Sequence, residues 1–250
     1  MKINIAFDLS IFIYANFHIH KNIEGGLEPE RFSKSVLKQI QGILKDLQKS
    51  YKIGEYVICA DSNNFRRDFY PEYKAQRVEN TEVENLKEFV IDYVRDSGNF
   101  VLREMGLESD DLLFLYCLKR TQEGTPCMIV SNDNDCKLML LEGSSFYKYK
   151  SKQVIDYNEN DQKLHRFKKV LLGDSGDNIP RILRKGLGEV WVEKFYNNHT
   201  PGPLSTYYKS LQNLEGLDLE LVKRNIILTN YSLKIYEQFV ENFTQKFERI

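Results

Sequence analysis

The sequence predicts an α/β fold with a mostly parallel central sheet flanked by helices, followed by a helical C-terminal region. Two observations lead to this prediction. Up to about residue 157, short apolar runs typical of strands alternate with segments of helical periodicity, and such alternation builds parallel sheets covered on both faces. Beyond about residue 158, the strand-like runs give way to segments of helical character.

The strands are predicted from short apolar runs that end in polar residues. In chain order these runs are INIAFD, YVICAD, NFVLRE and CMIVSND, and the segments FYKYK and QVIDYN indicate edge strands or a hairpin. A helix is expected from Pro29 to about Ser50, where apolar residues recur at helical spacing. Further helices are expected at VENLKEFVIDYVRDSG, at SDDLLFLYCLKR and, as a short helix, at DCKLMLLEG.

The chain of 250 residues is long enough to bury a substantial core. Its length fits one large domain or two closely packed ones. We expect a single domain over residues 1–250, with an α/β core at 1–157 and a helical part at 158–250, because no repeat or low-complexity linker divides the chain. The helical part contains the segments HRFKKVLLG, GEVWVEKFY, PLSTYYKSLQ and LELVKRNIILTNYSLKIYEQFVENF.

Composition excludes several classes of protein. The hydrophobic content of 42% is that of a globular protein, and no apolar run approaches the length of a membrane span. The four cysteines form no CxxC pair and lie in apolar segments, so we expect buried free thiols in a reducing cytoplasm and no zinc site. The net charge of −1 decides little, because acids and bases gather in separate groups along the chain.

Three of the strand-like runs end in an aspartate: Asp8, Asp61 and Asp133. The carboxyl ends of parallel strands meet at one edge of a sheet, where ligands of open α/β sheets bind, so we expect these side chains to converge. Further carboxylates flank the predicted crevice, namely Glu108, Asp110, Asp111, Asp135, Asp174 and Asp177.

Such a cluster cannot stay ionised without protons or cations, because like charges repel and burial penalises them. Oxygen-only ligands favour Mg²⁺ or Mn²⁺, and two such ions roughly 4 Å apart can drive an in-line phosphodiester hydrolysis without a side-chain nucleophile. The alternative for any single aspartate is the cap of the following helix, which is equally common. The recurrence of the pattern favours a metal-dependent nuclease.

The chain resembles the flap endonuclease or 5′-nuclease superfamily, and within it most closely the bacteriophage ribonuclease H of the T-even type. The resemblance spans nearly the whole chain through the ordered motifs FDLS, ICADSNNFRRDFYPEYKAQR, LESDDLL, IVSNDNDC and LLGDSGDNIP. It implies a PIN-like 5′-nuclease core, an arch or clamp at about residues 63–98, and a helix–three-turn–helix element that grips duplex DNA. It also implies 5′→3′ exonuclease and flap endonuclease activity.

The resemblance assigns roles to the carboxylates in two groups. Those around a first metal ion would be Asp8, Asp61, Glu108, Asp110, Asp111 and Asp133. Those around a second would be Asp135, Asp174 and Asp177.

The resemblance also assigns roles within RRDFYPEYKAQR. Lys74 and Arg77, expected on one side of a helix at i, i+3 spacing, match basic residues that neutralise charge on the scissile phosphate. Arg66 and Arg67 would assist or bind flanking phosphates, and Tyr73 matches a position on which the terminal base stacks. The alternative is a solvated basic loop in which Tyr70 and Tyr73 anchor the core.

The segment after GDNIP departs from the family pattern. A glycine usually follows the proline soon, whereas here Arg184 and Lys185 precede Gly186 and Gly188. We expect these four residues to bind duplex phosphates, and the departure disfavours a potassium ion at this place.

The leading hypothesis is a Mg²⁺-dependent, structure-specific 5′-nuclease that uses two metal ions. Its expected substrates are DNA with a 5′ flap, nick or end and RNA–DNA hybrids, and its expected role is removal of RNA primers or flaps in phage DNA replication. We expect a monomer in the cytoplasm of a bacterial or phage-infected cell, without membrane contact. A polymerase clamp or a single-strand-binding protein are the candidate protein partners. The alternatives are a PIN-type single-strand ribonuclease and a non-catalytic DNA-structure-binding protein.

Overall fold

The computed structural model describes residues 2–20, 28–77, 80–199, 202–215, 217–231 and 236. Within these residues the chain divides into two compact units. The first, here called the sheet unit, comprises the described parts of Met1–Phe65 and Glu79–Tyr157. The second, the helical unit, comprises those of Arg66–Val78 and Asn158–Val240, so the basic segment RRDFYPEYKAQR packs with the C-terminal helices.

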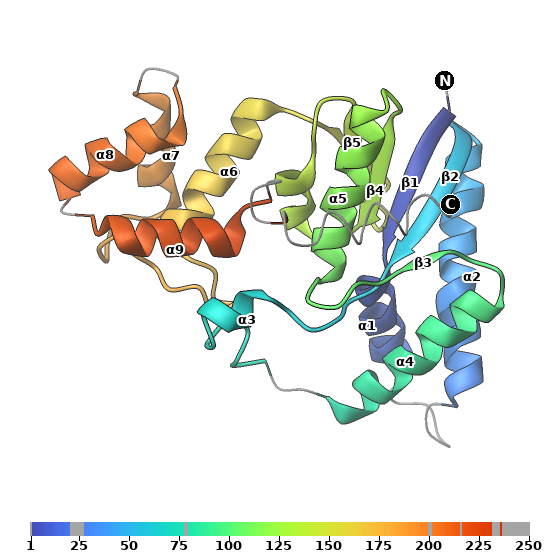
Figure 1. Cartoon of the computed structure of the whole chain (residues 1–250). Coiled ribbons are helices and arrows are strands. Elements are labelled where there is room, and N and C mark those ends of the chain that lie inside the picture. The colour runs from blue at the N-terminus through green and yellow to red at the C-terminus, as the bar shows by residue number, and fades with distance from the viewer. Residues whose placement is uncertain are drawn as a thin grey trace. The chain divides into compact units, whose positions relative to one another are not determined.

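A six-stranded sheet forms the centre of the sheet unit as far as its residues are described (Figure 1). Its strands are β1 (Lys2–Asp8), β2 (Lys52–Cys59), β3 (Val101–Leu102), β4 (Cys127–Ser131), β5 (Ser144–Lys148) and β6 (Gln153–Asp156). They lie in the order β3-β2-β1-β4-β5-β6, and all neighbours are parallel except β5 and β6. The prediction of a mostly parallel sheet is therefore confirmed, and β5 with β6 is the expected hairpin at its edge.

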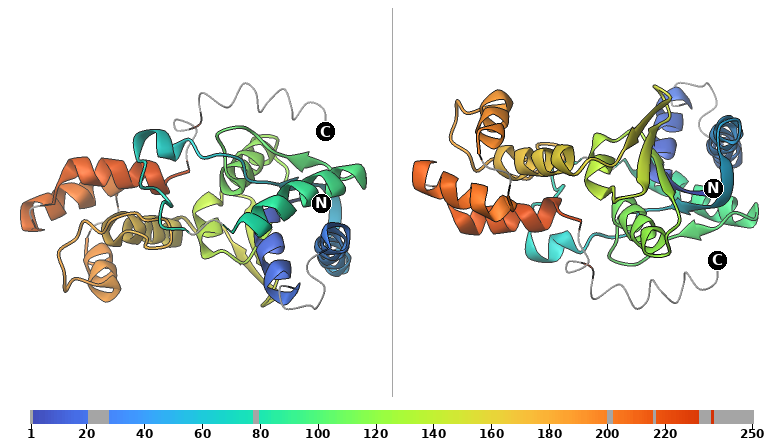
Figure 2. Two further views of the ribbon diagram at one scale, coloured as in Figure 1. Left: turned by 90° about the horizontal axis from the view of Figure 1, so that it is seen from below. Right: turned by 90° about the horizontal axis from the view of Figure 1, so that it is seen from above.

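Helices cover both faces of this sheet. Ile5 and Phe7 of β1 share a core with buried residues of α1 (Leu9–His20), α2 (Pro29–Gln48) and α4 (Thr81–Asp96). Because side chains alternate along a strand, Ala6 and Asp8 belong to the opposite face. There Cys127 of β4 meets Cys117 of α5 (Ser109–Gln122), with 2.8 Å between their Sγ atoms. Figure 2 shows α5 and α1 on opposite sides of the sheet.

The sequence explains the helices of the first face. In α2 the buried residues Phe32, Val36, Ile40, Leu44 and Leu47 repeat every three to four positions, and Pro29 stands at its first turn. Helix α4 begins after Asn80, whose side chain accepts hydrogen bonds from the amides of Glu82 and Val83 at 3.1 and 3.4 Å.

The strand order reverses between β1 and β4. The chain proceeds from β1 to β2 and β3 on one side, then to β4, β5 and β6 on the other. Open α/β sheets bind their ligands at the carboxyl ends of the strands beside such a reversal. The fold therefore places its candidate site where β1 and β4 end.

The helical unit contains α3 (Arg66–Phe69), α6 (Glu159–Leu172), α7 (Glu189–Asn197), α8 (Leu204–Glu215) and α9 (Leu219–Thr229). Its core gathers around Phe167, whose ring contacts four other aromatic rings at centroid distances of 5.4–6.2 Å. The predicted helical C-terminal region is thus confirmed. The helical segment expected after α9 lies largely outside the described residues.

The segment at about 63–98, for which an arch or clamp is expected, is divided between the units: residues 66–77 belong to the helical unit, and α4 packs on α2 in the sheet unit. Two local predictions differ from the structure. Lys74 and Arg77 do not share a helix face: α3 ends at Phe69, and Lys74 lies in a turn with φ of 56°. Helix α1 was not predicted at all.

The short 3₁₀ helix η1 (Asn134–Met139) lies where the sequence predicts a short helix after β4.

Of the helices that the structure describes, none combines the length and apolarity needed to cross a membrane.

Candidate functional site

Three aspartates lie at the carboxyl edge of the sheet, as predicted. Asp8 is the last residue of β1 and is 5% exposed. Asp61 follows the end of β2 by two residues, and Asp133 follows the end of β4 by two residues and caps η1. The parallel strands thus bring together side chains that are far apart in the sequence.

Two serine hydroxyls hold the carboxylate of Asp8. Ser109 donates from Oγ to Oδ1 of Asp8 at 3.0 Å, and Ser131 donates from Oγ to Oδ2 at 3.0 Å. Ser109 is the first residue of α5 and Ser131 the last residue of β4, and both are buried. Each oxygen of Asp8 therefore accepts a hydrogen bond from a different element.

Asp61 is held from three directions. The amide of Ser109 donates to its Oδ1 at 2.7 Å, and the hydroxyl of Ser10 donates to its Oδ2. The ammonium of Lys87 on α4 lies 3.9 Å from Oδ2. Arg103 donates from Nε to the main-chain oxygen of Asp61 at 2.9 Å and pairs with Glu88 of α4, which fixes α4 to this edge of the sheet.

The carboxyl of Asp8 is hard to ionise, first because it is buried and then because other carboxylates lie nearby. Burial, followed by the charges of Asp61 and Asp133, raises the pKa of Asp8 from 3.8 to about 7. The hydrogen bonds from Ser131 and Ser109 act in the opposite direction. Near neutral pH this carboxyl is thus balanced between its neutral and charged forms.

The carboxylates of the LESDD motif have different surroundings: Glu108 and Asp111 cap α5, whereas Asp110 does not belong to this cap. Glu108 and Asp111 form a capping box at the start of α5, in which the Glu108 amide donates to Asp111 Oδ2 at 2.9 Å. Asp111 is fully buried in this arrangement. Asp110 lies in the first turn of α5, next to Ser109, which hydrogen-bonds to Asp8. Burial and then the charges of Asp110 and Asp8 raise the pKa of the Cys136 thiol.

Asp135 lies in the first turn of η1. Its amide donates to Asp133 Oδ1 at 2.9 Å, so the two carboxylates of NDND follow each other around the end of β4. The structure therefore brings together Asp8, Asp61, Asp110, Asp133 and Asp135 at one end of the sheet unit. It engages Glu108 and Asp111 in capping α5.

The donor chemistry of this edge fits a hard divalent cation. Its aspartates offer oxygen atoms as ligands, and a bound cation would stabilise the ionised form of Asp8, which is buried beside Asp61 and Asp133. Within the ranges that the structure describes, no three Asp, Glu, His or Cys side chains close around one point. Mg²⁺ commonly keeps several waters and takes only one or two carboxylates, so an open set of this kind suits it.

The remaining predicted carboxylates belong to the helical unit, where both form ion pairs. Asp174 Oδ2 lies 2.7 Å from Lys169 Nζ. Asp177 Oδ1 lies 2.7 Å from Arg77 Nη2 and 3.8 Å from Lys74 Nζ.

The loop GDSGDN and the segment YKAQR, about 100 residues apart in sequence, are joined by main-chain contacts as well. The Lys74 amide donates to Asp177 O at 2.9 Å, Gln76 donates to Ser175 O at 2.7 Å, and Arg77 Nε donates to Gly176 O at 3.0 Å. Gly173 opens the loop with φ of 71° and approaches Pro180 so closely that a Cβ would lie 2.7 Å from its carbonyl carbon. We call the contacts of Lys74, Gln76 and Arg77 with the residues 175–177 the Asp177 network.

Two residues predicted to contact nucleic acid are buried in this structure. Arg66 is 1% exposed, and its guanidinium lies 6.0 Å from the ring of Tyr73 and 5.8 Å from that of Tyr231. Tyr73 is 3% exposed, packs with Ile179, and directs its hydroxyl to Asp177 Oδ2 at 3.4 Å. Neither side chain faces solvent here, and the packing of Tyr73 is what its alternative role as a core anchor predicts.

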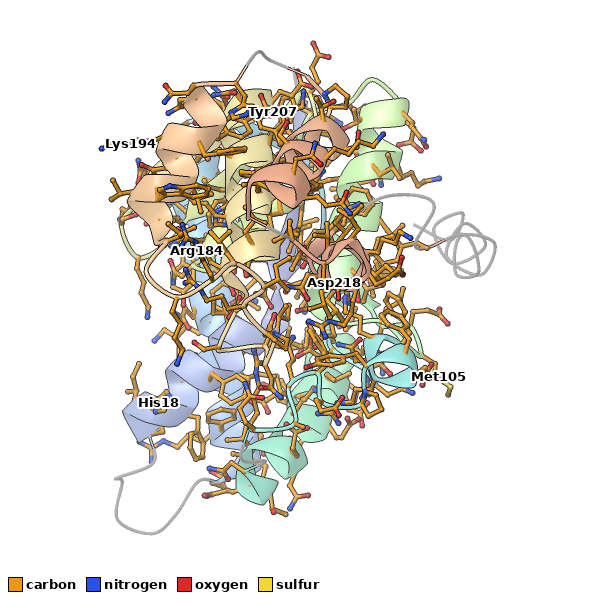
Figure 3. All side chains as sticks on the ribbon, turned by 90° about the vertical axis from the view of Figure 1, so that its left-hand side faces the viewer. His18, Met105, Arg184, Lys194, Tyr207 and Asp218 are labelled. Atoms are coloured by element: carbon orange, nitrogen blue, oxygen red, sulfur yellow. The ribbon has the colours of Figure 1, made fainter. Side chains whose placement is uncertain are left out.

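The other predicted contacts of the helical unit are exposed. Arg67 and Arg77 are exposed, and Lys74 is partly exposed. Arg184 lies on the loop between α6 and α7 (Figure 3), next to the exposed Lys185 and Gly186. Gly186 has φ of 95°, and Gly188 is the N-cap of α7.

Sequence reasoning missed the polar residues that surround the aspartates. They are Ser10, Lys87, Arg103, Ser109 and Ser131. Serine is common and carries no charge, so only the ends of β4 and α5 beside predicted carboxylates could have drawn attention to Ser131 and Ser109.

The chain is similar to known proteins over most of its length. The family model described as "5'-3' exonuclease, N-terminal resolvase-like domain" matches residues 5–165. A 5′-3′ exonuclease of Buchnera aphidicola subsp. Schizaphis graminum is 25% identical over 241 residues, which are 91% of this chain and 80% of the relative. One from Buchnera aphidicola subsp. Acyrthosiphon pisum is 24% identical over 232 residues, covering 88% and 78%.

Solved structures share the fold. A bacteriophage T5 flap endonuclease in complex with DNA and metal ions superposes with a TM-score of 0.64 at 20% identity, covering 94% of this chain and 92% of that one. A T5 protein co-crystallised with metal ions gives a TM-score of 0.65 at 18% identity, covering 98% and 99%. With the family model matched over residues 5–165, the chain belongs to the 5′-3′ exonuclease family defined by the N-terminal resolvase-like domain, and it is a nuclease hydrolase.

Proposed function

We propose that this nuclease depends on divalent metal ions and cleaves phosphodiester bonds at 5′ ends, nicks and flaps of DNA and in RNA–DNA hybrids. The observation that carries the proposal is the convergence of Asp8, Asp61 and Asp133 at the reversal of strand order. A buried carboxyl with a pKa of about 7 beside two further carboxylates favours a bound cation. The metal ions of the T5 relatives support the same inference by analogy.

Asp8, Asp61 and Asp133 are the residues that would hold the first cation, with Asp110 nearby. Bound there, a divalent ion supplies Lewis-acid stabilisation of phosphate charge and lowers the pKa of a bound water. The chain contributes orientation: the bonds from Ser109 and Ser131 fix Asp8, and those from Ser109 and Ser10 fix Asp61. Glu108 and Asp111 contribute by starting α5, which presents Ser109.

A second metal group at Asp135, Asp174 and Asp177 is the finer part of the proposal. Its support is the order of the family motifs along the chain. In the helical unit, Asp174 and Asp177 are paired with Lys169 and Arg77. A cation at these carboxylates would therefore compete with their basic partners.

The DNA contacts that we propose come from basic residues, all exposed except Lys74, whose side chain is 12% exposed, and from main-chain amides. Lys74, Arg77 and Arg67 would bind phosphates close to the cleaved bond, and Arg184, Lys185, Gly186 and Gly188 would bind the duplex further away. The loop that joins α6 and α7 is the candidate helix–three-turn–helix element. Gly186, with φ of 95°, and Gly188, the N-cap of α7, are the glycines whose amides we expect to bind phosphate.

The biological role that fits these substrates is removal of RNA primers or flaps during DNA replication, in a bacteriophage if the resemblance to the T-even enzyme extends to its source. We place this activity in the cytoplasm. Cys59, Cys117, Cys127 and Cys136 are all free and buried, and a reducing compartment maintains such thiols.

A panel of 5′-labelled substrates tests the function. Flapped, nicked and blunt DNA duplexes, an RNA–DNA hybrid and single-stranded RNA are incubated with and without Mg²⁺, and the products are sized. We expect Mg²⁺-dependent cleavage of the duplex and hybrid substrates, which Asp61→Asn abolishes. Cleavage restricted to single-stranded RNA would support a PIN-type ribonuclease instead. DNA binding without cleavage of any substrate would identify a non-catalytic binding protein.

A further inference from the structure

The hydroxyls of Ser109 and Ser131 both donate hydrogen bonds to the carboxylate of Asp8, and they come from different elements of the sheet unit. Ser131 belongs to β4, the strand beside β1, and alternation places it on the face of the sheet that α5 covers. Ser109 reaches Asp8 from the first turn of α5.

Each serine also contacts the neighbouring candidate ligand. The Ser109 amide donates to Asp61 Oδ1 at 2.7 Å, while its hydroxyl donates to Asp8. The Ser131 hydroxyl accepts from the amide of Asp133 at 3.2 Å while donating to Asp8. One residue thus ties Asp8 to Asp61, and the other ties Asp8 to the backbone of Asp133.

Burial protects these hydrogen bonds from competition with water. Ser109 is 4% exposed and Ser131 fully buried, so water competes little for their hydroxyls. A buried hydroxyl retains its partner because leaving it unsatisfied costs free energy. With one donor on each oxygen, the Asp8 carboxylate is held in one rotation about its terminal bond, which otherwise has a broad range.

We propose that Ser109 and Ser131 are positioning residues, which hold Asp8, Asp61 and Asp133 in the arrangement that binds a divalent cation. This inference rests on the metal-dependent function proposed above and adds two residues to it. Groups that hydrogen-bond to metal ligands orient them, and losing one such group typically weakens metal binding about 10- to 100-fold.

The test measures Mn²⁺ binding to the DNA-free protein by calorimetry and by electron paramagnetic resonance. The variants are Ser109→Ala and Ser131→Ala, which remove a hydroxyl, and Ser109→Thr and Ser131→Thr, which keep one. Ser33→Ala is the matched control, because Ser33 is also buried in the sheet unit but donates to the main-chain oxygen of Pro29. Thermal unfolding in EDTA reports the stability of every variant.

We expect each alanine variant to bind Mn²⁺ about 10- to 100-fold more weakly than the wild type, and each threonine variant to recover most of the loss. The double alanine variant should lose less than the product of the single losses, because both hydroxyls act on one carboxylate. Ser33→Ala should bind Mn²⁺ normally.

Three results would overturn the inference. Wild-type Mn²⁺ affinity in both alanine variants would remove the positioning role. Threonine variants that bind as weakly as the alanine variants would assign the effect to packing. A wild-type protein that binds Mn²⁺ no better than Asp8→Asn would overturn both this inference and the metal-dependent function. By contrast, normal Mn²⁺ binding with serine dependence but no cleavage of DNA would refute only the proposed function.

Discussion

The guanidinium of Arg77 lies 2.7 Å from the carboxylate of Asp177. The family resemblance assigns Arg77 to substrate phosphate and Asp177 to metal, yet within the helical unit the two side chains bind each other. Lys74 joins them at 3.8 Å, and the side chain of Asp177 is only 17% exposed. In the Asp177 network, the positive charges of Arg77 and Lys74 therefore surround a carboxylate that could also bind a metal cation.

Replacing Asp177 by Asn separates its two possible roles. The substitution removes a charge that neutralises Arg77 and Lys74, so DNA binding in Ca²⁺ should be preserved or tightened. If Asp177 holds a second metal ion, cleavage in Mg²⁺ should fall by about 100-fold or more, because such an ion supplies several kcal/mol of transition-state stabilisation. Asp135→Asn should lower cleavage in the same way. Single-turnover rates and filter binding measure the two effects, and unchanged turnover in either variant would remove that residue from the metal group.

Lys74 allows charge to be tested apart from backbone strain. Its φ of 56° lies in the left-handed region, which costs an L-residue roughly 1–2 kcal/mol and glycine little. Lys74→Gly should therefore be more stable than Lys74→Ala by about 1 kcal/mol in urea unfolding. Both variants lack the ammonium, so both should lose about 100-fold or more in single-turnover cleavage. Wild-type cleavage by the glycine variant would show that the ammonium does not act on the phosphate.

Asp8 should make the stability of the metal-free protein depend on pH. Its pKa is about 7 in the folded state against an ordinary 3.8. Between these values the unfolded chain has released a proton that the folded chain keeps, so the free energy of unfolding falls as pH rises from about 4 to about 7. A difference of about three pKa units corresponds to about 4 kcal/mol.

Asp8→Asn removes this penalty, because asparagine does not ionise. In EDTA at pH 8 the variant should be more stable than the wild type by up to about 4 kcal/mol, and at pH 4 the difference should vanish. Urea unfolding at the two pH values measures it, with Asp92→Asn on the exposed side of α4 as control. A variant that is less stable than the wild type at pH 8 would contradict the electrostatic account of this edge.

Lys87 forms an ion pair with Asp61, a candidate metal ligand. Its ammonium lies 3.9 Å from Asp61 Oδ2, and its side chain is 15% exposed. Lys87→Ala removes that charge, and Mn²⁺ should then bind roughly 3- to 10-fold more tightly at low salt. Arg95→Ala is the control on the same helix, since Arg95 pairs with Asp92. Weaker Mn²⁺ binding by Lys87→Ala would instead give Lys87 a part in arranging Asp61.

Two features of the molecule could be predicted from sequence: the helices with a regular apolar spacing, and the carboxylates that follow the ends of parallel strands. Asp8, Asp61 and Asp133 could be placed together from sequence because parallel strands end at one edge of a sheet. Helix α2 could be placed because its buried residues recur every three to four positions while the remainder is polar. Both inferences need only local patterns and a general rule of topology.

The parts that escaped prediction depend on contacts distant in sequence or on blurred patterns. Helix α1 buries Phe12 and Phe17 on one side but carries the exposed Tyr14 and Ile19 on the other, so no polar face marks it. The turn at Lys74 is set by its bond to Asp177, a partner 103 positions along the chain.

The burial of Arg66 and Tyr73 shows the same limit. Arg66 donates to the hydroxyl of Tyr236 at 3.1 Å, and Tyr73 packs with Ile179 and Leu228. A basic, aromatic segment indicates a nucleic-acid surface when taken alone, and only the helices that fold over it reveal which of its side chains remain outside.

The most direct test of the central claim is a time course of cleavage of a 5′-labelled flapped duplex by the wild type and by Asp8→Asn, each in Mg²⁺ and in EDTA. We predict short 5′ products from the wild type in Mg²⁺ alone, and none from the variant although it folds and binds the duplex. Equal cleavage in EDTA, or by Asp8→Asn in Mg²⁺, would contradict a metal-dependent centre at the end of β1.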